Sequence, residues 1–166
     1  MTIYLGADHA GFKLKGRVKE WLASSLKFKE NEIMDFGALA YDEKDDYPDF
    51  VRPVAQAVAN DPEQSRGIII GGSGQGEAMC ANRVAGVRAA VYYGAGGSSD
   101  GQKIGVNIGS SDELNIIKLS RQHNDANVLS LGARFLTDEE ALKAVQLFLE
   151  TSFSGDERHI RRLAKF

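Results

Sequence analysis

The chain has 166 residues, of which 43% are hydrophobic and 26% charged, a composition typical of one folded globular domain and not of a disordered chain. Its 20 Lys and Arg residues stand against 23 Asp and Glu residues, which gives a formal charge of −3. This balance excludes a general attraction for nucleic acid or an acidic membrane, so a bound anion must be held by a local group of cations.

Neither a membrane-spanning segment nor an export signal is predicted. The apolar runs stay well short of the roughly 18 residues that a spanning helix needs, and Asp8 interrupts the first run where a secretory signal would continue. The single cysteine, Cys80, can form no internal disulfide and has no Cys-x-x-Cys partner. We therefore expect a cytoplasmic protein with a buried, inert cysteine.

Short apolar runs alternate with helical patterns along the chain. In chain order, the predicted segments are a strand at 2–5, a helix at 11–27, a strand at 32–36, a helix from Pro48, a strand at 67–70, a helix at 77–84, a strand at 87–93, a helix at 113–122, a strand at 128–131, a helix at 138–149 and a last short helix or arm at 155–162. Strands that alternate with helices predict an α/β fold whose parallel sheet is covered on both faces.

Glycines gather in the middle of the chain: 12 of the 18 lie between Gly67 and Gly109, so the chemistry is expected there. The run Gly71 to Gly76 follows a buried strand, and loops after strands carry the ligand sites of parallel sheets. The run departs from the P-loop, the dinucleotide-binding pattern and the nucleophile elbow, so no nucleotide or serine-hydrolase site is predicted. It fits a tight turn as well as an anion cradle.

Glu77 follows this run at the expected start of a helix. It is either a partner of the helix dipole, worth roughly 0.3–1 kcal/mol, or a base beside a bound ligand. The three histidines, His9, His123 and His159, lack the paired spacing of a metal motif, so no metal site is predicted.

The C-terminal segment is locally basic. Arg158, Arg161 and Arg162 form either a solvated helix face or a set of bidentate anion ligands. In a chain of net negative charge, such arginines are the more credible anion ligands.

Seven segments together resemble one known family. They are Gly6 to Gly11, Asp46 to Asp49, Gly71 to Glu77, Ala81 to Arg83, Gly86 to Ala89, Arg121 to Val128 and Leu131 to Arg134. Over most of 1–93 and 113–166 the chain resembles the RpiB/LacA/LacB family of sugar-phosphate isomerases, in particular the type B ribose-5-phosphate isomerases. The resemblance implies a Rossmann-like three-layer α/β/α sandwich with a central parallel sheet. It also implies a homodimer or a dimer of dimers with active sites at the subunit interface.

The same resemblance implies interconversion of ribose 5-phosphate and ribulose 5-phosphate with no metal, nucleotide or other cofactor. Glu77 would move the proton between C1 and C2 through an enediolate, and His123 would protonate the ring oxygen. Another branch of the family has a cysteine at the position of Gly71, so a thiol base is absent here. The implied substrate-binding residues are Asp8 and Tyr47 for the sugar, Gly72, Ser73, Gly74, Gln75, Gly76 and Asn124 for the enediolate oxygens, and His9, Arg134, Arg158 and Arg162 for the phosphate, some of them from a partner subunit.

One segment departs from the family pattern. The chain near 94–111 is longer than the family's usual connection, and it is either a surface insertion or a segment that covers the pocket or extends the dimer interface. We expect one domain over 1–166, with this insertion and a C-terminal helical arm near 155–166. The exact substrate stays open, with galactose 6-phosphate, allose 6-phosphate or a tetrose phosphate as alternatives. A sugar-phosphate-binding module without turnover is an alternative of another class.

Overall fold

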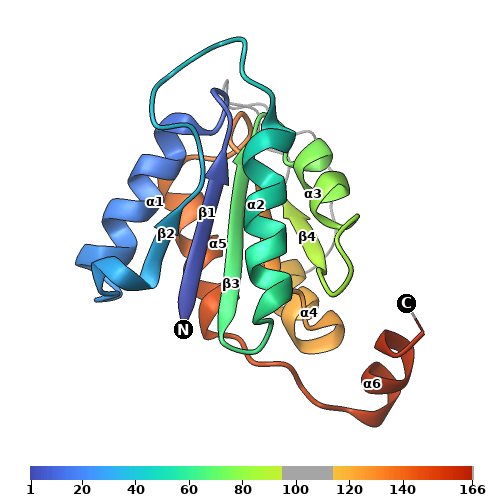
Figure 1. The fold of residues 1–166 in the computed structure, drawn as a ribbon. Helices are drawn as coiled ribbons and strands as arrows, with labels where there is room; N and C mark the ends of the chain where they lie inside the picture. The colour runs from blue at the N-terminus through green and yellow to red at the C-terminus, as the bar shows by residue number, and fades with distance from the viewer. Residues whose placement is uncertain (95–113, 166) are drawn as a thin grey trace.

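The computed structural model describes residues 1–94 and 114–165, with the side chain of Asn115 left out (Figure 1). Apart from Gly94, the predicted insertion at 94–111 therefore lies outside the described residues. Within the described part of the chain, no helix has the length and apolar character needed to span a membrane.

Strands and helices alternate as the sequence predicts. The strands are β1 (Thr2–Ala7), β2 (Ile33–Asp35), β3 (Ser65–Gly71), β4 (Ala89–Tyr92) and β5 (Val128–Gly132). The helices are α1 (Phe12–Ser24), the 3₁₀ turn η1 (Glu30–Glu32), α2 (Tyr47–Asn60), α3 (Gln75–Ala81), α4 (Asn115–Asn124), α5 (Asp138–Glu150) and α6 (Glu157–Leu163).

The five strands form one parallel sheet in the order β2-β1-β3-β5-β4. β1 pairs with β3 so that Leu5 lies beside Ile68, and β3 pairs with β5 so that Gly67 lies beside Val128. From β1 the chain continues to the β2 side of the sheet, and from β3 it continues to the β4 side. The order therefore reverses between β1 and β3, which is where ligands bind in open parallel sheets.

Helices cover both faces of the sheet. α2 and α3 lie on one face, whereas α1, α4 and α5 lie on the other (Figure 1). Each face has its own core of fully buried side chains, with Val54 and Ile69 in the first and Leu22 and Phe148 in the second. The predicted three-layer α/β/α fold is confirmed.

Several element ends differ from the predicted ones by a few residues. The predicted helix at 11–27 ends at Ser24, and Lys27 then takes a left-handed conformation with φ of 60°, which an α-helix cannot contain. The predicted helix at 113–122 runs on to Asn124 and ends because Asp125 is left-handed, with φ of 43°. This last difference matters because it places His123 inside the final turn of α4.

The C-terminal arm leaves α5 in an extended segment and returns to the end of α4. The backbone N–H of Ser154 donates to the carbonyl oxygen of Gln122 over 3.1 Å, and α6 follows. In Figure 1 this arm lies on the side of the molecule opposite the arrowheads of the strands.

Candidate active site

Asp8 lies immediately after β1, at the point where the strand order reverses. Its Oδ1 accepts hydrogen bonds from the backbone N–H groups of Ala10 (3.0 Å) and Gly11 (3.3 Å), which shapes the turn into α1. A Cβ at Gly11 would overlap the carbonyl oxygen of Ile70, so only glycine lets this turn approach the end of β3. The carboxylate of Asp8 is consequently buried beside the glycine run, with 6% of the residue exposed.

The glycine run connects β3 to α3. Gly74 has φ of 76°, a left-handed conformation that suits glycine, and its carbonyl oxygen accepts the hydroxyl proton of Ser130 over 2.6 Å. The carbonyl oxygens of Gly71 and Gly72 accept from the N–H groups of Ala133 and Arg134. These bonds hold the run against the end of β5 and fix the start of α3.

Glu77 is buried beneath the glycine run, with 4% of the residue exposed. A Cβ at Gly71 would overlap Glu77 Oε1, so the carboxylate occupies the space that any side chain at position 71 would need. Burial raises the pKa of Glu77, and the negative charge of Asp8 raises it further, while its own backbone N–H and Arg134 act in the opposite direction. A carboxyl with a raised pKa is suited to accepting and returning a proton near neutral pH.

Two further predicted residues flank the run. A Cβ at Gly72 would come within 3.2 Å of the Arg134 guanidinium, and a Cβ at Gly76 would come within 2.9 Å of the Tyr47 hydroxyl. A cation and a phenol therefore stand on either side of the cradle that covers Glu77. We call the following residues the strand-end cluster: Asp8, His9, Tyr47, the run Gly72 to Gly76, Glu77 and Arg134.

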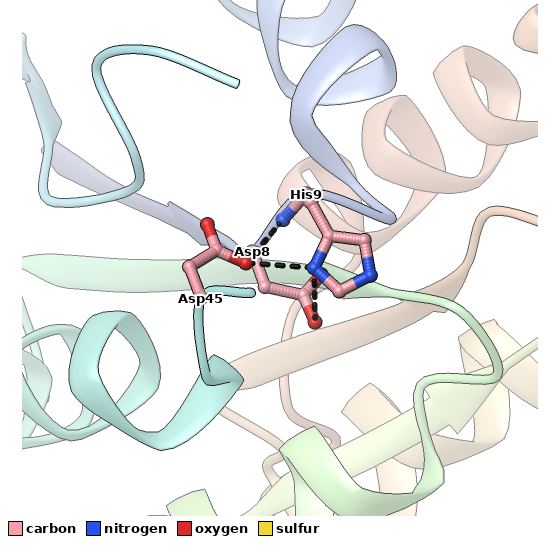
Figure 2. Close-up of side chains that lie close together, drawn as sticks. All are labelled: Asp8, His9 and Asp45. Carbon is pink, nitrogen blue, oxygen red and sulfur yellow. Dashed lines mark hydrogen bonds and ion pairs between the residues drawn. The ribbon is translucent and has the colours of Figure 1, made fainter. Parts of the chain in front are cut away.

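His9 is held by an aspartate from the loop before α2 (Figure 2). Asp45 Oδ1 lies 2.7 Å from His9 Nδ1 and accepts the backbone N–H of His9 over 2.9 Å, while Asp8 Oδ2 lies 4.0 Å from Nδ1. The hydrogen bond to Asp45 raises the pKa of His9, and the charge of Asp8 adds to it, against the effect of burial.

The donor atoms of Asp8, His9 and Asp45 lie within 4.8 Å of one another, a spacing found in small metal sites as well as in ion-paired clusters. The direct bond between His9 Nδ1 and Asp45 favours the ion-paired cluster, because a metal ion would need that nitrogen unprotonated and free.

The remaining predicted residues are His123, Asn124, Arg158 and Arg162. They belong to α4 and α6, where α6 meets the end of α4, and together with His159 we call them the arm cluster. The rings of His123 and His159 stack with centroids 4.3 Å apart. His159 is buried, and its Nε2 lies 3.7 Å from Asp156 Oδ2. Burial lowers the pKa of His159, as do the neighbouring His123 and Arg158. Arg158 and Arg162 are exposed beside this stack.

Asp125 fixes the end of α4 and with it Asn124, the last predicted residue of the arm cluster. Its two carboxylate oxygens accept from Arg88 (2.7 Å) and Arg121 (2.8 Å), and Arg88 Nε also donates to the carbonyl oxygen of Asn124 over 3.1 Å. These bonds hold the left-handed turn that separates α4 from β5.

Within one chain the two clusters lie at opposite ends of the strands, the strand-end cluster at the carboxyl ends and the arm cluster at the amino ends. Glu77 follows the carboxyl end of β3, whereas His123 precedes β5, whose first residue, Val128, pairs with Gly67 of β3. The strand residues Gly67 to Gly71 lie between these two levels and, at about 3.3 Å per residue, span roughly 13 Å. The structure therefore brings together Asp8, His9, Tyr47, Gly72, Ser73, Gly74, Gln75, Gly76, Glu77 and Arg134, and leaves His123, Asn124, Arg158 and Arg162 apart from them.

Two residues with site-like geometry were not predicted as site residues. Asp45 lies in a loop rich in acidic residues, where nothing in the sequence distinguishes it from its neighbours. His159 stands between Arg158 and Arg162, and this position in the basic arm is a signal that could have drawn attention to it.

Comparison with known proteins identifies the family. The protein-family model described as Ribose/Galactose Isomerase matches residues 3–99 and 102–166 of the chain. The chain belongs to the ribose/galactose isomerase family. Among its relatives, ribose-5-phosphate isomerase B of Mycobacterium tuberculosis is 39% identical over 98% of this chain and 86% of the relative. The probable ribose-5-phosphate isomerase B of Mycoplasma genitalium is 37% identical over 99% and 92%.

Solved structures of the family share the fold of this ribose/galactose isomerase. Ribose-5-phosphate isomerase B from Mycoplasma genitalium with bound ribulose-5-phosphate superimposes with a TM-score of 0.81 at 36% identity, covering 99% of this chain and 92% of the other. The Clostridium thermocellum enzyme gives 0.79 at 36% identity, covering 99% and 94%. The resemblance drawn from the seven sequence segments is confirmed.

Proposed function

We propose that this ribose/galactose isomerase interconverts ribose 5-phosphate and ribulose 5-phosphate, as the names of its relatives indicate for them. The observation that carries the proposal is the buried Glu77 carboxyl beneath the glycine run, at the edge of the sheet where parallel folds bind ligands. In the forward direction Glu77 takes the proton from C2 of the open-chain aldose and returns it to C1. The backbone N–H groups of the run, with Ser73, stabilise the negative oxygen of the enediolate.

The phosphate of the substrate is held from the strand-end cluster by His9 and Arg134. Asp8 and Tyr47 contact the sugar hydroxyls. A phosphate monoester carries about −1.5 to −2 charges at neutral pH, so two cations on one side match its charge. The isomerisation moves protons within the sugar and needs no external oxidant or reductant, so we propose that no redox cofactor takes part. Glu77 serves as the base and the N–H groups of the run bind the enediolate oxygen, so we propose that no metal ion takes part either.

We infer further that the active site is completed by a second copy of the chain, in a homodimer or a dimer of dimers. His123, which would protonate the ring oxygen, lies at the opposite end of the strands from Glu77 in its own chain, with the roughly 13 Å from Gly67 to Gly71 between the two ends. Arg158 and Arg162 are exposed on α6, in an arm that extends away from the body of the molecule (Figure 1). A partner that supplied these residues, with Asn124, would complete the set.

A cytoplasmic location goes with this proposal. A doubly charged sugar phosphate does not cross a bilayer unaided, because moving a charge into hydrocarbon is costly. An enzyme that uses such a substrate therefore works in the compartment where sugars are phosphorylated.

The proposal is tested by following ketose formation from ribose 5-phosphate with purified, EDTA-treated protein, beside allose 6-phosphate and galactose 6-phosphate. We expect turnover of the pentose, unchanged by EDTA. Turnover of a hexose phosphate alone would replace the substrate but keep the chemistry. Binding of all three sugars without any turnover would instead support a binding module.

A further inference from the structure

The loop between β2 and α2 passes over the carboxyl ends of the strands (Figure 1) and carries Asp45 down to His9. Asp45 has about a tenth of its side chain exposed, with a relative accessibility of 11%. Both hydrogen bonds recorded for its carboxylate within the described residues come from His9, one from the backbone N–H and one from Nδ1. Its other oxygen, Oδ2, is buried and has no hydrogen-bond partner among the described residues. Among the described residues, the Asp45 carboxylate therefore accepts hydrogen bonds from His9 alone.

This arrangement determines which ring nitrogen of His9 remains for a ligand. A carboxylate accepts hydrogen bonds, so His9 Nδ1 must carry the proton in the 2.7 Å contact. The rings of Tyr41 and His9 lie in a T-shaped contact, with centroids 6.4 Å apart and planes at 88°, which restricts the His9 ring further. Nε2 is the nitrogen that remains for an anion.

We propose that Asp45 is a positioning residue that orients His9 and holds it as a cation, so that the Nε2–H group of His9 binds the phosphate of the sugar substrate. This inference rests on the proposed function, because it deepens the role of His9 there. It adds to the site a residue, Asp45, that acts only through another side chain.

The charges around His9 support the cationic form. Asp45 and Asp8 both face the ring, at 2.7 Å and 4.0 Å from Nδ1, and both raise the pKa of His9. Among the residues that the structure describes, Tyr41 is the other titratable group in contact with the ring. Beyond Asp8 lie Glu77 and Arg134, whose charges act on each other. The protonated ring therefore persists to higher pH than an ordinary histidine, whose pKa is about 6.5.

The raised pKa of His9 determines how phosphate binding changes with pH. A cationic His9 binds the phosphate well below its pKa, and the bond weakens as the pH rises through that value. In Asp45→Asn the amide still accepts a hydrogen bond but carries no charge, so the pKa of His9 falls. The KM of the variant then begins to rise at a lower pH than the KM of the wild type.

The experiment measures KM and kcat for ribose 5-phosphate against pH in the wild type, Asp45→Asn and Asp42→Asn. Asp42 is an exposed aspartate of the same loop and serves as the matched control. We expect the ratio of the Asp45→Asn KM to the wild-type KM to be near one at low pH and to peak at about fivefold between the two His9 pKa values. kcat should stay within about twofold. Titration of the phosphate itself cancels in this ratio.

A double substitution shows whether Asp45 acts through His9. In a His9→Gln background, Asp45→Asn should raise KM no further. A KM ratio that does not change with pH, or an added effect in that background, would overturn the inference in favour of a merely structural loop contact. If the asparagine variant fails to fold, Asp45→Ser keeps an acceptor for the His9 backbone and takes its place.

A separate measurement removes the dependence on turnover. The NMR titration of the three histidine rings, with His9 assigned by its loss in His9→Gln, should show a lower His9 pKa in Asp45→Asn and an unchanged one in Asp42→Asn. Inorganic phosphate serves as the ligand, and its affinity should follow the same order. If the wild type turns over no sugar phosphate, the proposed function fails, while this titration still decides the role of Asp45.

Discussion

The strand-end cluster and the arm cluster differ in how much of their structure one chain supplies. In the first, Asp8 and Glu77 are buried, and His9 has its counter-charge inside the chain. In the second, the His123–His159 stack is built within the chain, but Arg158 displays 59% of its side chain. One chain thus supplies the buried carboxyl Glu77 and a histidine, His9, that already has its counter-charge, whereas the arm presents exposed arginines. The comparison indicates that the strand-end cluster is fixed by contacts within its own chain, while the arginines of the arm remain exposed.

The largest effect is expected at Glu77. Glu77→Gln keeps the shape of the side chain and removes the base, so kcat should fall by about 10²- to 10⁴-fold with little change in KM. The melting temperature should not fall. Burial disfavours the charged carboxylate of Glu77 and so raises its pKa, and the neutral amide of glutamine does not have this cost. Steady-state kinetics and a thermal melt measure both quantities.

Glu20→Gln, on the exposed side of α1, is the control and should behave as the wild type. Full activity in Glu77→Gln would remove Glu77 from the mechanism and leave the strand-end cluster without its base.

The next prediction separates the two clusters between subunits. Glu77→Gln and His123→Ala should each be nearly inactive, yet a one-to-one mixed preparation should regain about a quarter of wild-type activity. Half of the randomly formed dimers are mixed, and each mixed dimer has one site in which the unsubstituted Glu77 of one chain meets the unsubstituted His123 of the other. Coexpression with two affinity tags gives the mixed species directly.

A preparation that mixes Glu77→Gln with the double variant Glu77→Gln/His123→Ala contains no intact site and is the matched control. Activity equal to the sum of the separate variants would show that the two clusters do not meet across a subunit interface.

The smallest of these three effects is expected in the arm. Arg162→Ala should raise KM for ribose 5-phosphate by about tenfold, since one charge-assisted bond to phosphate is lost, and leave kcat nearly unchanged. The melting temperature should not change, because Arg162 is exposed.

Arg161→Ala removes the same charge from the neighbouring, equally exposed position of α6 and is the control. Equal KM values in the two variants would mean that the arm acts through its overall charge and that Arg162 makes no specific contact.

The order of elements could be predicted because local patterns determine it. The uninterrupted apolar run Ile68 to Ile70 is a fully buried strand, and Thr137 with Glu140 forms the predicted capping box at the start of α5. Element ends were less predictable where a non-glycine residue takes a left-handed conformation. At Asp125 that conformation is held by Arg88 and Arg121, and Arg88 lies far away in the sequence.

The membership of the strand-end cluster was also predictable in part. Residues that follow β1 and β3 must meet, because neighbouring parallel strands end at the same edge. Asp45 escaped prediction because its partner is 36 residues away and its loop holds several other aspartates. Whether the arm cluster meets the strand-end cluster of a second copy of the chain is not encoded in any local pattern of the sequence.

The overlap between a side chain at position 71 and the Glu77 carboxylate has an evolutionary consequence. The resemblance implies a sister branch with a cysteine at this position. A lineage that exchanged the two bases one substitution at a time would pass either through a crowded pocket that holds both or through an empty one that holds neither. A side chain at position 71 therefore requires the Glu77 carboxylate to leave its present place, and this contact couples the two positions.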